Sequence, residues 1–163
     1  MSWSSLLAQK LRPDENGNLP RLWFLLGSEP LLAIEAQDAI RAAAFKAGYS
    51  ERKSFVFEGN ADYSPLYEAL GDQSLFGEKN LIEVVFPRAT IGKNGPAAVE
   101  AIIEHADEDK MVVVSLFDYD WTATKKDWFN HLMKAAVCIR SLVMRTDNLC
   151  ITGNIQFVCL VLA

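Results

Sequence analysis

The sequence has few cysteines and no pattern of paired cysteines. Its three cysteines are Cys138, Cys150 and Cys159, so their number is odd, all lie near the C-terminal end, and none forms a CxxC pair. Disulfide frameworks and zinc sites need paired spacings that are absent here. The cysteine content therefore excludes both and favours a reducing, cytoplasmic location.

The sequence also has no excess of basic residues and no long apolar segment. Lys and Arg number 16 against 21 Asp and Glu, which gives a net charge of −5. A domain that binds nucleic acid through its own electrostatic surface is usually basic, so we expect any DNA contact to be weak or indirect. No apolar run reaches the roughly 18 residues of a membrane span, and the first residues, MSWSSLLAQKLRPDENG, have no signal-peptide pattern.

Hydrophobic residues make up 50% of the 163 residues, enough for one folded domain with a substantial core. Unbroken apolar runs at 22–26 and 111–117 are typical of strands that are covered on both faces. Further strands are expected at 52–57, 80–86 and from 137. Helical patterns cover 4–11, 28–47 and 96–105. Two more helices are expected, one after Ser64 and one after Thr122 or Thr124. This alternation predicts an α/β fold with three layers, in which helices flank a mostly parallel sheet.

The segment 66–86 contains two large apolar residues where a loop is expected. Leu75 and Phe76 lie between Gly71 and Gly77, after a helical pattern and before a strand. Loops run over the protein surface, so these two residues need an explanation. Either they fold back onto the core, or they project outward and anchor another protein.

The first strand leads into a helix, the junction at which α/β proteins bind phosphate. Here the junction reads Gly27-Ser28-Glu29-Pro30. A phosphate-binding loop of the form G-x-x-x-x-G-K-[ST] needs backbone N–H groups and a lysine. This junction has one glycine and no lysine, an acidic residue, and a proline without an N–H. We therefore expect no productive ATP binding.

No other group of residues predicts catalysis or a cofactor. His105 and His131 are isolated on helical segments, where surface or packing roles are expected. Asp118 and Asp120 follow a strand without a third metal ligand in view, which favours a solvated loop. We therefore predict no catalytic residue, no metal and no cofactor.

Taken together, several short motifs resemble one family, the delta subunit of bacterial DNA polymerase III, in its N-terminal domain. The resemblance covers roughly residues 20–139. It is carried by Leu26-Gly27-Ser28-Glu29-Pro30-Leu31-Leu32 after a strand, Glu35-Ala36, Ser74-Leu75-Phe76 before the strand residues Leu81-Ile82-Glu83, and Trp128-Phe129 near Leu132.

The resemblance implies a core like that of the P-loop NTPases and AAA+ ATPases, with a degenerate phosphate loop and no ATP hydrolysis. It implies a clamp-loader subunit that binds and opens the β sliding clamp during DNA replication. Such a subunit is a non-catalytic part of a DNA-directed DNA polymerase, a nucleotidyltransferase complex. The expected partners are the β clamp and the other clamp-loader subunits.

The family's Ser-Leu-Phe element inserts a leucine and a phenylalanine into a pocket of the clamp. In this chain those residues are Leu75 and Phe76, with Gln73 and Ser74 shaping the approach. Two alternatives remain open: a P-loop-type nucleotide-binding protein, or a stand-alone scaffold domain whose apolar pair belongs to the core.

The resemblance also divides the chain. Residues 1–19 form an N-terminal helix and loop, residues 20–140 the AAA+-like domain, and residues 141–163 an atypical tail. The tail does not resemble the family's continuation, and we expect the family's lid and collar domains to be absent from this chain. We expect a truncated or frameshifted end to explain this.

Overall fold

The computed structural model describes residues 3–27, 30–73, 75–118 and 122–141. Its centre is a five-stranded sheet in the order β2-β3-β4-β1-β5, and every neighbouring pair is parallel. The strands are β1 (Leu22–Gly27), β2 (Tyr49–Val56), β3 (Lys79–Phe86), β4 (Lys110–Leu116) and β5 (Val137–Ser141).

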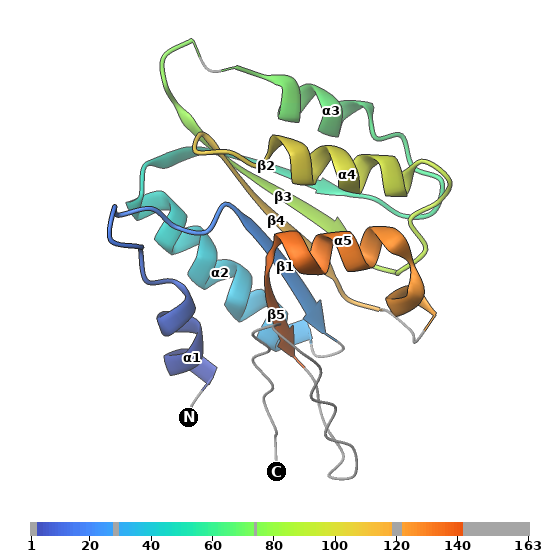
Figure 1. The fold of residues 1–163 in the computed structure, drawn as a ribbon, viewed down its shortest axis with the longest axis horizontal. Coiled ribbons are helices and arrows are strands. Elements are labelled where there is room, and N and C mark those ends of the chain that lie inside the picture. The colour runs from blue at the N-terminus through green and yellow to red at the C-terminus, as the bar shows by residue number, and fades with distance from the viewer. Residues whose placement is uncertain (1–2, 28–29, 74, 119–121, 142–163) are drawn as a thin grey trace.

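The helices form a layer on each face of this sheet (Figure 1). They are α1 (Trp3–Lys10), α2 (Pro30–Lys46), α3 (Ser64–Gly71), α4 (Gly95–His105) and α5 (Asp127–Ala135). One hydrophobic core joins the sheet to α3, α4 and α5, and a second joins it to α1 and α2. The predicted three-layer α/β fold with a parallel sheet is confirmed. Among the described helices, none is long and apolar enough to cross a membrane.

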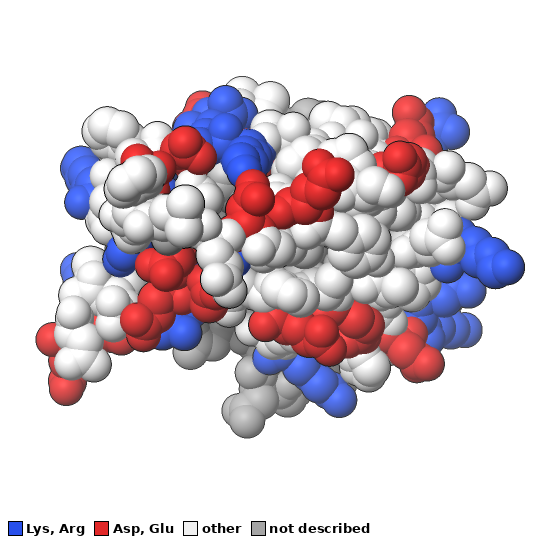
Figure 2. All heavy atoms as spheres, turned by 90° about the horizontal axis from the view of Figure 1, so that it is seen from above, with Lys and Arg blue, Asp and Glu red and all other residues white. Residues whose placement is uncertain are grey.

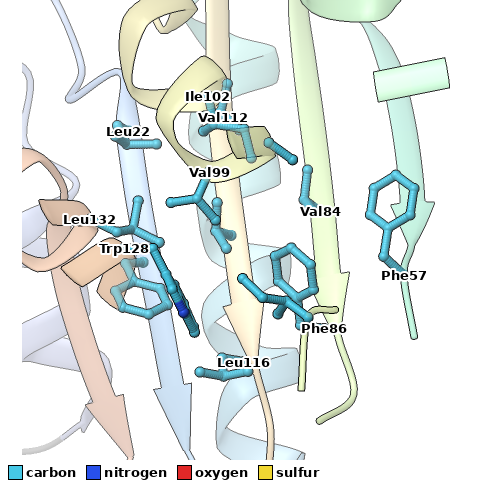
Figure 3. Packing of buried hydrophobic residues seen from close by; sticks show 14 of the residues in the cluster. Leu22, Phe57, Val84, Phe86, Val99, Ile102, Val112, Leu116, Trp128 and Leu132 are labelled. Atoms are coloured by element: carbon cyan, nitrogen blue, oxygen red, sulfur yellow. The ribbon is translucent and has the colours of Figure 1, made fainter. Parts of the chain in front are cut away.

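The apolar strands supply both cores because successive side chains point to opposite faces of a sheet. In β1, Phe24 belongs to the core under α3, α4 and α5, whereas Trp23 belongs to the core under α2. In β4, Val112 and Val113 divide in the same way. Figure 3 shows the first of these cores, with side chains from the central strands packed against those of α4 and α5.

Two sequence predictions of element ends are wrong. β2 runs over Tyr49–Val56, three residues earlier than the predicted start at 52. It is an edge strand whose first half is largely exposed, so apolar residues do not mark its start. α5 begins at Asp127 and not directly after Thr122 or Thr124, because the 3₁₀ helix Ala123–Lys125 and an extended Lys126 precede it.

Cys138 is buried in β5, and burial raises the pKa of its thiol to about 12. The thiolate is the reactive form of cysteine, so this side chain is an unreactive part of the core at neutral pH. Cys150 and Cys159 lie outside the described residues.

A charged group interrupts the apolar strand β3. The side chain of Glu83 is 4% exposed, and its two carboxylate oxygens accept hydrogen bonds from Arg41 at 2.9 and 3.1 Å and from Arg52 at 2.6 Å. The two arginines come from α2 and β2, so the buried carboxylate joins three elements. Removing the partners of a buried charge is strongly destabilising because the charge is left without compensation.

We expect the double substitution Arg41→Ala/Arg52→Ala to lower the free energy of unfolding by about 3 kcal/mol. Urea denaturation monitored by circular dichroism measures this change. Arg88→Ala is the control, because the Arg88–Glu58 pair is 3.8 Å long and exposed, and we expect a change below about 0.5 kcal/mol. Equal stability of the double variant and the control would contradict the role of Glu83.

Candidate partner-binding site

The loop between α3 and β3, residues 72–78, carries the two most exposed large apolar side chains of the described residues. Leu75 is 92% exposed and Phe76 is 87% exposed. Gly77 has a φ of +69°, a left-handed conformation that glycine adopts readily, so the chain can turn back toward β3. The interpretation that Leu75 and Phe76 belong to the core is therefore wrong, and their outward orientation is confirmed.

The loop is held at both ends. At its start, the N–H of Asp72 donates to the carbonyl of Glu68 at 2.9 Å, and the carboxylate of Asp72 accepts from Lys53 at 2.8 Å. The hydrogen bond and charge of Lys53 lower the pKa of Asp72 below its usual value. At its end, the N–H of Asn80 donates to the carbonyl of Asp109 at 2.7 Å. These contacts fix the base of the loop, while its middle extends into solvent.

Gln73, predicted to shape the approach to the pair, is exposed in the same loop. Ser74 lies outside the described residues. The helix before the loop explains why the chain leaves the core here. Leu66 and Leu70 are buried in α3, whereas α3 ends at Gly71 and the chain becomes extended at Asp72. The last contact of α3 with the core therefore precedes the exposed pair.

Two cavities, of about 270 and 220 Å³, lie beside the loop. Both are lined by Asp72, Gln73, Glu78 and Asn80, so they adjoin each other. We call them the loop cavities. They were not predicted from the sequence, although one signal was present: Asn80 is a polar residue near the start of the largely apolar strand β3.

The predicted phosphate-loop position lies at the carboxyl ends of the parallel strands, whereas the α3–β3 loop lies at their amino ends. Gly27 is the last residue of β1 and pairs with Ser141 of β5, and Pro30 is the first residue of α2. This junction follows the carboxyl end of a strand, whereas the α3–β3 loop precedes the amino end of one (Figure 1). The structure therefore does not bring these two predicted sites together. Ser28 and Glu29 lie outside the described residues.

The other candidate side chains make local contacts. His105 Nδ1 lies 2.8 Å from the carbonyl oxygen of Ala101 in the same helix, and His131 Nδ1 pairs with Glu100. Asp118 is exposed, and Asp120 lies outside the described residues. Across the described ranges, no three His, Cys, Asp or Glu side chains are grouped so that they could hold a metal ion.

Comparison with known proteins places this fold and loop in a family. The model of the family described as "DNA polymerase III, delta subunit" matches residues 23–141. The chain belongs to this family. The matched range contains both the β1–α2 junction and the α3–β3 loop, so both features lie within the delta-subunit domain.

Two curated delta subunits show how much of the family is represented here. The DNA polymerase III subunit delta of Escherichia coli K12 is 32% identical over 93 residues, which is 57% of this chain and 26% of that protein. The subunit delta of Haemophilus influenzae is 25% identical over 114 residues, which is 68% of this chain and 32% of that protein. The chain therefore spans about a quarter to a third of the length of these delta subunits.

Proposed function

We propose that this chain is the clamp-binding domain of a clamp-loader subunit, which binds and opens the β sliding clamp during DNA replication. The observation that supports this function is the exposure of Leu75 and Phe76, at 92% and 87%, on a loop fixed at both ends. Two large apolar side chains at the tip of such a loop suit insertion into an apolar pocket.

Insertion would supply enough free energy for a specific complex. Full burial of a leucine or phenylalanine side chain contributes roughly 1.5–3 kcal/mol, so the pair would contribute about 3–6 kcal/mol. Two anchors of this size are comparable to the hot spots that dominate protein interfaces. Because the bases of the loop are already ordered, little of this free energy would be lost in fixing the backbone.

Opening the clamp needs more than tight binding. A ligand shifts an equilibrium only by the difference between its affinities for the two states. The domain would therefore open the ring by binding the open or strained clamp more tightly than the closed one. The direct test is to compare clamp binding with and without the Leu75 and Phe76 side chains.

The domain acts in this proposal without hydrolysing ATP and as a non-catalytic part of the polymerase. The β1–α2 junction supports this, because Gly27 is paired within the sheet and Pro30 begins α2 without an N–H to donate. A phosphate-binding helix N-terminus depends on backbone N–H groups and on a lysine, and the sequence Gly27-Ser28-Glu29-Pro30 contains no lysine.

We expect no binding of ATP in the presence of magnesium. Isothermal titration calorimetry with up to about 1 mM nucleotide should give only heats of dilution, because the junction sequence Gly27-Ser28-Glu29-Pro30 has neither the second glycine nor the lysine of a phosphate-binding loop. A magnesium-dependent affinity tighter than about 1 mM would instead favour a P-loop-type nucleotide-binding function. The same titration without magnesium is the control.

The remaining partners in this proposal are the other clamp-loader subunits, with DNA contacted weakly or through them. The net charge of −5 opposes a direct electrostatic role in DNA binding. Figure 2 views the side of the molecule that is uppermost in Figure 1. Among the described residues on that face, acidic side chains are spread over several groups, and basic ones form only separate groups between and beside them.

A further inference from the structure

Asn80 has a buried oxygen atom with no partner. Asn80 is 6% exposed, and none of the described residues donates a hydrogen bond to its side-chain oxygen, Oδ1. An unsatisfied buried acceptor destabilises the fold, because it has lost its hydrogen bonds to water without gaining others. Asn80 also lines both loop cavities, immediately beside the exposed pair. An acceptor in this position is suited to a hydrogen-bond donor that arrives from outside.

The charges around Asn80 indicate what kind of donor fits. Among the described residues, five carboxylates and two ammonium groups line the two loop cavities. Asp72 is paired with Lys53, and Asp107 and Asp109 line the same cavity as Lys110. Glu51 and Glu78 add further negative charge. A cationic group would therefore be attracted, and an anion would be repelled.

The strand register places the acceptor and a carboxylate together. Glu51 of β2 is the direct partner of Asn80 in the parallel ladder, and partners in adjacent strands point to the same face of the sheet. One of the two cavities is lined by Glu51, Asn80 and Phe76 together. An entering cation would thus meet a carboxylate, an amide oxygen and an aromatic ring.

We propose that the loop cavities bind a basic side chain, arginine or lysine, that the sliding clamp presents next to the pocket for Leu75 and Phe76. This inference rests on the proposed function and adds a second, polar contact to the apolar one. A guanidinium or ammonium group donates to Asn80 Oδ1 and lies against the carboxylates of Glu51 and Glu78. The apolar pair provides affinity, and the cavity fixes the orientation of the clamp and speeds association.

The first test removes charge while keeping shape. The variant Glu51→Gln/Glu78→Gln should bind the clamp about tenfold more weakly, and its affinity should depend less on salt concentration. The matched control is Glu35→Gln/Glu58→Gln, which removes two exposed carboxylates far from the loop, on α2 and after β2. This control should bind as the unmodified chain does. Surface plasmon resonance at several salt concentrations measures both effects.

The second test separates binding from stability. Asn80→Leu replaces an unsatisfied buried amide by an apolar group of similar size, so the melting temperature should stay the same or rise. Clamp binding should nevertheless weaken several-fold, because the acceptor is lost. A purely structural role for Asn80 predicts unchanged clamp binding in a folded variant.

The outcomes distinguish the inference from the proposed function. If the unmodified chain does not bind the clamp, the proposed function fails and the inference fails with it. If the chain binds, and substitution of Leu75 and Phe76 abolishes binding, the proposed function stands. In that case, clamp binding by Asn80→Leu and by Glu51→Gln/Glu78→Gln equal to that of the control would overturn the inference alone.

Discussion

The double variant Leu75→Ala/Phe76→Ala should bind the sliding clamp at least about a hundredfold more weakly than the unmodified chain. The two side chains are 92% and 87% exposed, so their burial in a clamp pocket would contribute about 3–6 kcal/mol. Truncation to alanine removes most of that contribution. Binding of both chains to the clamp of the organism that encodes them measures the loss.

Folding should be unaffected by the same change. Because both side chains are almost fully exposed, truncation leaves no cavity in the core, and the melting temperature should change by less than about 2 °C. Thermal denaturation monitored by circular dichroism tests this. A large fall in melting temperature would show that the pair stabilises the fold, and the proposed function would lose its main support.

The chain offers a matched control for this experiment. Leu31 and Phe45 of α2 are 62% and 72% exposed, so Leu31→Ala/Phe45→Ala removes the same side-chain types from a different surface. This control should bind the clamp as the unmodified chain does. If it loses affinity equally, clamp binding would depend on general surface hydrophobicity rather than on the α3–β3 loop.

The largest loss of stability is expected from Phe24→Ala. Phe24 of β1 is fully buried, and its ring packs edge-to-face on that of Phe129 with centroids 5.5 Å apart. Removing a buried phenylalanine side chain costs about 3–5 kcal/mol, because both the apolar contacts and the volume are lost. Urea denaturation should show this decrease in the free energy of unfolding, which is a large fraction of the stability of a small domain.

Phe45→Ala is the control for this prediction, because it makes the same chemical change at an exposed position. We expect it to alter the free energy of unfolding by less than about 0.5 kcal/mol. If Phe24→Ala were as mild as Phe45→Ala, the packing of β1 between two helical layers would be wrong.

The sequence predicted the layer architecture because its physical signal is local. A strand that is covered on both faces needs an unbroken apolar run, and 22–26 and 111–117 supply two such runs. Trp128 and Phe129, which form one of the family motifs, are buried as well. The signal was weakest at β2, which pairs with only one strand among the described residues. Polar residues are tolerated in such a strand, and there the predicted limits are wrong.

The orientation of Leu75 and Phe76 was beyond the reach of pattern alone. An apolar pair next to the end of a helix can turn inward or outward, and the neighbouring residues in the sequence do not determine which orientation is adopted. The resemblance to the delta subunits favoured the outward orientation. The tertiary structure decided it, because the contacts of Asp72 with Lys53 and of Asn80 with Asp109 fix both ends of the loop next to the amino end of β3.

By itself, the sequence determined the alternation of strands and helices, the apolar runs, the absence of a phosphate-binding pattern and the family motifs. Each of these depends on residues that are close together in the chain. Only the tertiary structure determined which side chains share a surface. Glu51, Asn80 and Lys110 come from three different segments, and they meet because β2, β3 and β4 are neighbours in register. Such register depends on packing over the whole sheet, which no single segment encodes.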